Sequence, residues 1–208
     1  MSSRFQAIIA VCATALALAA PAIAADKTPG FAYTPPKIAQ SCFGDGLTML
    51  ARERGEYATH LATYAANQVV ETRASKESLT RARRLLALAM QLSPRNRKAL
   101  VTNFQLRKGV LPEKSEGTYT GGVLARLLIA RAELLKRDGG AKNELLARCF
   151  IELAAEMDPR NEDAVYAYEL QRIDKGELDW SRITDPAEKK ASPAPAPKPT
   201  PEPKPPAR

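Results

Sequence analysis

Apolar residues recur every three to four positions from about residue 45 to residue 173, and no stretch alternates long enough to form a strand. The segment 77–92 is apolar on two sides, which is typical of a helix packed between neighbours. Proline and glycine interrupt the pattern at regular places. Together these features predict an all-α chain, with six helices over about residues 46–72, 77–92, 96–108, 121–137, 142–157 and 161–174.

One part of this pattern occurs twice, sixty-five residues apart. Residues 82–99 and 147–164 align without a gap, and both contain an Ala-Arg pair, a Leu-Ala pair and a Pro-Arg-Asn turn. A long fixed period in a helical sequence is typical of stacked helical units. Each three-helix unit is too small to bury its own apolar faces, so we expect the two units to stack around one core.

The duplicated segment resembles the second helix of a tetratricopeptide repeat (TPR) and its exit into the following helix. The matching positions in the two copies are Ala82, Leu86, Ala89 and Pro94, and Ala147, Ile151, Ala154 and Pro159. The resemblance covers about residues 60–174 and implies a TPR-like α-solenoid that serves as a scaffold for protein–protein contacts. It also implies a concave face lined by the first helix of each pair, whose candidate binding residues here are Tyr64, Asn67, Lys98, Val101, Gln105, Lys108, Asp163, Tyr166 and Leu170. Packing between helices is the alternative role for Tyr166.

The two ends of the chain differ from the helical part. Residues 1–24 combine a basic start, a short apolar run and a small-residue cleavage pattern, so we expect a signal peptide that is removed on export to the periplasm or envelope of a bacterium. Residues 25–44 are expected to be an extended lead-in to a helical domain at 45–183. Proline at alternate positions predicts a disordered, polyproline-like tail over 184–208, with a spacer as the second reading.

Charge is distributed unevenly in a chain of net charge +8. No acid lies between Ser78 and Pro112, whereas Cys149 to Leu170 holds six acids and one arginine. A basic surface attracts an acidic protein, an anionic polymer or a lipid surface, and the two halves could also pair between molecules. Ordinary solvated faces are the alternative, and nucleic acid is disfavoured because no aromatic residues interleave with the basic ones. The basic patch comprises Arg81, Arg83, Arg84, Arg95 and Arg97.

No constellation of catalytic residues stands out. The single histidine and the two cysteines beyond the signal segment cannot supply an ordinary zinc site, and no phosphate-binding glycine motif occurs. Neither a metal nor a cofactor is therefore expected. Cys42 and Cys149 could form a disulfide in an oxidising compartment, worth about 4–5 kcal/mol in the chain-entropy model, or remain two buried thiols. Trp180 is expected to cover the end of the stack.

These observations favour a non-enzymatic, exported helical-repeat adaptor that binds envelope proteins. A module that binds an anionic envelope polymer or lipid through the basic first unit is the second hypothesis. An enzyme without a recognisable motif is the third. The identity of the partner is not encoded in any of these patterns.

Overall fold

A computed structural model describes residues 30–38, 41–116 and 119–186, and over this part of the chain it contains helices and no strands. The all-α class is confirmed, and six helices fall within five residues of the predicted ranges. The signal-like segment lies outside the described residues. Of the predicted tail at 184–208 only residues 184–186 are described, and Thr184 ends the last helix. After a short 3-10 helix, the elements are α1 (Ala51–Glu71), α2 (Lys76–Leu92), α3 (Arg97–Arg107), α4 (Gly121–Asp138), α5 (Ala141–Met157), α6 (Glu162–Lys175) and the unpredicted α7 (Ser181–Thr184).

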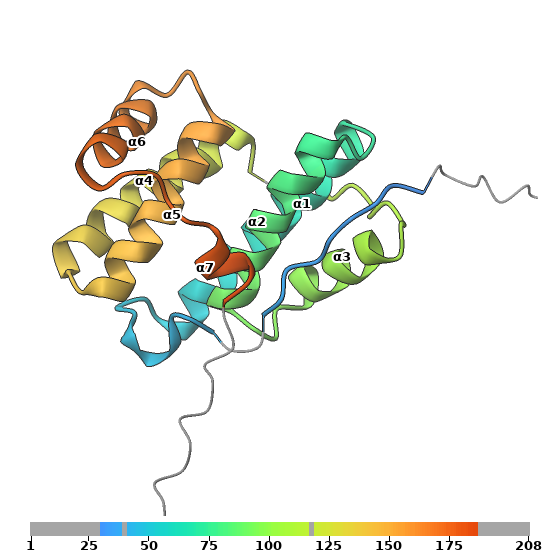
Figure 1. Ribbon diagram of the computed structural model, residues 1–208, viewed down its shortest axis with the longest axis horizontal. Coiled ribbons are helices and arrows are strands. Elements are labelled where there is room, and N and C mark those ends of the chain that lie inside the picture. The colour runs from blue at the N-terminus through green and yellow to red at the C-terminus, as the bar shows by residue number, and fades with distance from the viewer. Residues whose placement is uncertain (1–29, 39–40, 117–118, 187–208) are drawn as a thin grey trace, which may run out of the picture.

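The helices form two antiparallel pairs, α1 with α2 and α4 with α5, which lie side by side in Figure 1. The turns inside the two pairs occupy equivalent positions of the repeat. Arg73 and Ala74 adopt positive φ angles of 51° and 56° in the first turn, and Gly139 and Gly140 adopt 70° and 87° in the second. Glycine adopts such angles without a steric cost, so the second unit makes its turn at lower strain.

The duplicated segments have the same local structure. Helices α2 and α5 begin and end at equivalent positions of the repeat. Helices α3 and α6 also begin at equivalent positions. The turn residues Ser93 and Asp158 have similar dihedral angles, φ −144° and ψ 90° against φ −139° and ψ 81°. The side chains of Asn96 and Asn161 then cap the next helix by accepting from the backbone N–H three residues on, at 3.0 and 3.2 Å.

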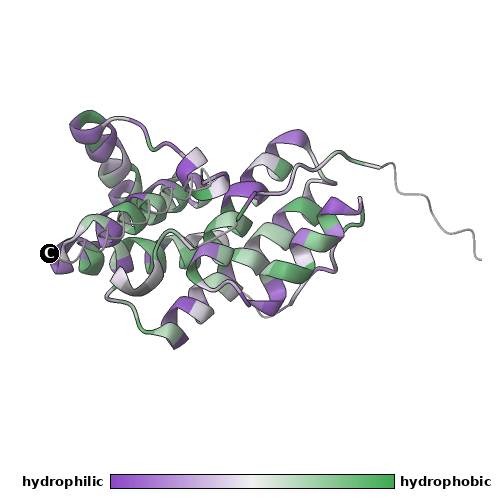
Figure 2. Cartoon of the chain, turned by 60° about the horizontal axis from the view of Figure 1, so that its bottom comes forward, coloured by the Kyte–Doolittle hydropathy of each residue, from purple (hydrophilic) through white to green (hydrophobic). Residues whose placement is uncertain are grey.

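One core runs through both helix pairs. Small residues let the helices approach closely, and α1 buries Ala58, Ala62, Ala65 and Ala66 completely. Larger side chains such as Leu86 and Phe150 fill the space between helices. Figure 2 shows hydrophobic stretches concentrated where the helices lie against one another. Among the described helices, none is long and apolar enough to cross a lipid bilayer.

The third helix of each unit packs differently. Helix α3 lies chiefly against α1, whereas α6 lies chiefly against α5. Residues 31–38 run in an extended conformation between α2 and α3, so the predicted lead-in is a packed part of the fold (Figure 1). Helices α3 and α6 consequently occupy opposite ends of the molecule, with α1, α2, α4 and α5 between them.

Candidate functional site

The nine candidate residues of the concave face lie in two separate groups. Tyr64, Asn67 and Lys98 lie with the rest of the first group on α1 and α3, and Asp163, Tyr166 and Leu170 lie on α6 at the opposite end of the molecule (Figure 1). The structure therefore does not join them in one concave surface. The physical reason is the different packing of the two third helices.

Two residues of the first group, Asn67 and Lys98, hold a loop in place. The side-chain amide of Asn67 exchanges hydrogen bonds with the backbone of Ser115, at 3.1 and 2.9 Å. The Lys98 ammonium donates to the Ser115 hydroxyl at 2.8 Å. Tyr64 is half-buried, and burial raises the pKa of its phenol. The contacts of Asn67 and Lys98 anchor the segment between α3 and α4, which gives these two side chains a structural role.

A hollow of about 360 Å³ lies beside these residues, between α1 and α3. Its lining includes Thr59, Asn96 and Val101. The Asn96 amide also donates to the Thr59 hydroxyl at 2.8 Å, so the floor of the hollow is fixed by the same residue that caps α3. Gln105 and Lys108 lie further along α3, half-buried and exposed respectively. The hollow is open and can receive a side chain from outside the molecule.

The predicted basic patch is not an open surface, because three of its five arginines form ion pairs within the chain. Arg84 contacts Glu152 at 3.2 Å and Glu156 at 2.8 Å, and Arg81 approaches Glu156 at 3.6 Å. Arg83 binds Asp185 at 2.7 Å. The opposite charges of the two halves thus meet inside one molecule at this place. Arg95 and Arg97 are exposed and have no ion pair within the described residues.

Trp180 lies at the centre of this ion cluster, so the prediction that it covers the end of the stack was wrong. Its indole N–H donates to Glu152 at 2.6 Å, and the Arg84 guanidinium lies 5.3 Å from the ring centroid. The chain returns over α2 after α6, which brings α7 and Trp180 to the junction of the two units (Figure 1). Burial raises the pKa of Glu152, and the Trp180 hydrogen bond and Arg84 partly offset this effect. Within the described ranges, no three side chains group as metal ligands.

The two thiols are free in the structure. Cys149 is fully buried in α5, and Cys42 is half-buried. The backbone N–H of Cys42 donates to the side-chain oxygen of Gln91 at 2.7 Å. Burial raises the pKa of both thiols, most strongly that of Cys149. Neither is therefore suited to nucleophilic attack at neutral pH. A disulfide between them stays a prediction.

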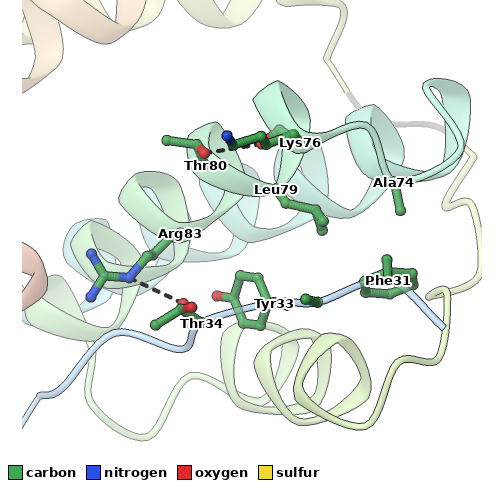
Figure 3. A pocket seen from close by; sticks show the side chains of 9 residues that line it. Phe31, Tyr33, Thr34, Ala74, Lys76, Leu79, Thr80 and Arg83 are labelled. Carbon is green, nitrogen blue, oxygen red and sulfur yellow. Dashed lines mark hydrogen bonds between the residues drawn. The ribbon is translucent and has the colours of Figure 1, made fainter.

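A cavity of about 700 Å³ lies between the lead-in and α2 (Figure 3). Tyr33 donates its hydroxyl to Asn103 of α3 at 3.0 Å, and the Arg83 guanidinium donates to the carbonyl of Thr34 at 3.0 Å. Burial raises the pKa of Tyr33. The lining combines the apolar side chains of Phe31 and Leu79 with the cations Lys76 and Arg83.

The sequence analysis named Val101, Tyr166 and Leu170 but missed three other exposed apolar residues of α3 and α6. Leu100 and Phe104 on α3 are 45% and 52% exposed, and Ile173 on α6 is 73% exposed. Exposed apolar side chains that lie close together mark interaction surfaces. The sequence signal that could have identified them is their helical spacing on the face opposite the buried alanine of each helix.

Comparisons with known proteins do not assign this site. No protein-family model matches the chain, and neither the curated proteins nor the solved structures give a match.

Proposed function

We propose that this protein is a non-enzymatic, exported adaptor of TPR-like architecture that binds proteins of the bacterial envelope. The duplicated helix–turn–helix with its paired asparagine caps supports the repeat architecture. The observation that carries the proposal is the exposure of apolar side chains on the two end helices. Val101 and Phe104 on α3, and Tyr166 on α6, are each at least 45% exposed.

These exposed side chains favour protein binding because they belong to rigid helices. Burying an apolar side chain that a helix already holds in place gains solvent-transfer free energy with little loss of conformational entropy. Aromatic residues such as Phe104 and Tyr166 are enriched at the centres of protein interfaces. Both end helices are also anchored at their N-termini by capped turns.

Site-specific photocrosslinking in the organism of origin tests the proposal. A photoreactive residue at Leu100, on the outer face of α3, should give discrete crosslinked proteins. The same residue at Leu50, which is also exposed but precedes α1, is the matched control and should not. Phe104→Asp should abolish the Leu100 products. Equal crosslinking from both positions, or substrate turnover that depends on one side chain, would contradict the proposal.

An anionic polymer or lipid surface is a second candidate partner, favoured by the cations around Phe104. The guanidinium of Arg107 and the ammonium of Lys108 lie 5.4 and 5.9 Å from the Phe104 ring centroid, and both side chains are exposed. Basic groups around an exposed aromatic residue suit an anionic membrane surface. Binding to vesicles with about 30% phosphatidylglycerol but not to neutral vesicles, lost in Arg107→Glu/Lys108→Glu, would support this candidate.

A further inference from the structure

The outer face of α3 carries a stripe with a cation at each end. Arg97, Val101, Phe104 and Lys108 follow one another at helical spacing, opposite the buried Ala99, Thr102 and Leu106. We call these four residues the α3 stripe. Val101 and Phe104 are about half exposed, and neither Arg97 nor Lys108 has an ion pair within the described part of the chain.

The outer face of α6 carries a stripe of the opposite sign. Asp163, Tyr166, Leu170 and Asp174 follow at helical spacing, and we call them the α6 stripe. Tyr166 and Leu170 are 70% and 44% exposed. No ion pair involves Asp163 or Asp174 among the residues that the structure describes.

The two stripes match in length as well as in charge. The end residues are eleven positions apart in both, which is about 16 Å along a helix at about 1.5 Å per residue. When one stripe lies on the other, each cation contacts a carboxylate and the apolar residues contact one another. Because the charge is the same at both ends of each stripe, this pairing holds for parallel and antiparallel helices.

The stripes cannot meet within one molecule, because α3 and α6 lie at opposite ends (Figure 1). We propose that the α3 stripe of one copy docks on the α6 stripe of a second copy, giving head-to-tail assemblies of this chain. A contact between two different surfaces propagates into an open chain or closes into a ring. Hollows beside both helices, about 360 Å³ at Val101 and about 200 Å³ at Leu170, give room for the facing side chains.

This inference rests on the proposed function, since it names the partner of the same outer faces. The charges that meet inside the molecule are not part of it. Arg81 and Arg84 are already paired with Glu156 and Glu152. The four charged ends of the two stripes form no ion pair among the described residues, although α6 also holds the paired residues Glu169, Arg172 and Lys175. The unequal charge distribution along the sequence thus serves two separate contacts, one within a copy and one between copies.

Sedimentation velocity with charge-swapped variants tests the inference. The wild type should show an average mass that rises with concentration between about 10 and about 500 µM at low salt, and that falls toward the monomer at about 0.5 M salt. Arg97→Glu/Lys108→Glu and Asp163→Lys/Asp174→Lys should each remain monomeric. An equimolar mixture of the two variants should associate again, and so should the variant with all four substitutions.

Arg126→Glu/Arg137→Glu on α4 is the control for the Arg97→Glu/Lys108→Glu variant, because it makes the same change in net charge at exposed positions that belong to neither stripe. It should associate like the wild type. Circular dichroism and thermal unfolding verify that every variant is folded. A monomeric wild type at the highest concentration, or stripe variants that associate like the wild type, would overturn the inference. Monomers that still give specific crosslinks from Leu100 would overturn it while leaving the proposed function intact.

Discussion

The two halves of this protein share a helix–turn–helix but use it differently. In the first unit, α3 packs against α1 because the extended segment 31–38 occupies the groove beside α2. In the second unit, α6 packs against α5, and its outer face is acidic where that of α3 is basic. The comparison teaches that a repeated sequence determines local structure, whereas the segments around it determine how the third helix docks and which surface it presents.

Equivalent core substitutions should produce the largest effects. Leu86→Ala and Ile151→Ala truncate side chains at matching positions of α2 and α5 that are 0% and 2% exposed. Each should lower the free energy of unfolding by about 2–5 kcal/mol, because a cavity replaces packed atoms. Chemical denaturation measures this. Both variants should unfold in one transition, since the units share a core, and two separate transitions would show that the halves fold independently.

Substitutions in the ion cluster around Arg84, which joins the two halves, should produce the second-largest loss of stability. Arg84→Ala should cost about 1–3 kcal/mol, because it leaves the Glu152 carboxylate, whose side chain is 12% exposed, without its cation. Arg97→Ala, an exposed cation of the same type, is the control and should change stability by less than about 0.5 kcal/mol. Equal losses in the two variants would argue against a structural role for the cluster.

The same cluster predicts a pH dependence. Because burial raises the pKa of Glu152, the folded state favours the protonated carboxyl group. The corresponding stability is present at low pH and is lost as pH rises from the unfolded-state value through the folded-state pKa. Glu152→Gln keeps an acceptor for Trp180 and should remove this loss. A difference between wild-type and variant stability that does not change with pH would contradict the prediction.

The two capping asparagines offer a finer comparison. Asn161→Ala should cost about 0.5–2 kcal/mol through loss of the cap. Asn96→Ala should cost more, because the Asn96 amide also donates to the Gly55 carbonyl and the Thr59 hydroxyl, at 3.2 and 2.8 Å. Substitution by aspartate keeps the cap but loses these donors, so it should rescue position 161 better than position 96. Thermal unfolding of the four variants checks the order.

A substitution in the lead-in should produce the smallest and most local change in stability. Tyr33→Phe removes one half-buried hydrogen bond to Asn103 and should cost about 0.5–1.5 kcal/mol. Hydrogen exchange should increase in α3, which the lead-in contacts, and stay unchanged in α6. Equal changes in both helices would mean that the lead-in does not distinguish the two units.

Local pattern was sufficient for the helices. The three-to-four-residue spacing predicted six of them, and Pro94 and Pro159 predicted the turns that end α2 and α5. The helices that follow these turns are capped by Asn96 and Asn161, two residues after each proline. A cap depends on dihedral angles that composition specifies only to within a few residues.

The candidate site was predicted in part. The resemblance to a tetratricopeptide repeat named residues that α3 and α6 expose, including Val101 and Tyr166, but it implied one concave face for two helices that lie at opposite ends of the molecule. Three of the five arginines of the predicted basic patch are paired within the chain, which local sequence could not reveal. Whether an arginine such as Arg84 is free depends on which acids pack opposite it, and those acids lie about seventy residues away in the sequence.

The sequence by itself determined the helical class, the repeat and the uneven charge, because each follows from residues close together in the chain. Only the tertiary structure decided which charges are paired, where Trp180 lies and which faces remain open. Those properties arise from contacts between distant segments, above all the lead-in between α2 and α3 and α7 against α2. The energy of such contacts depends on the packing of the whole chain, so no local pattern encodes it.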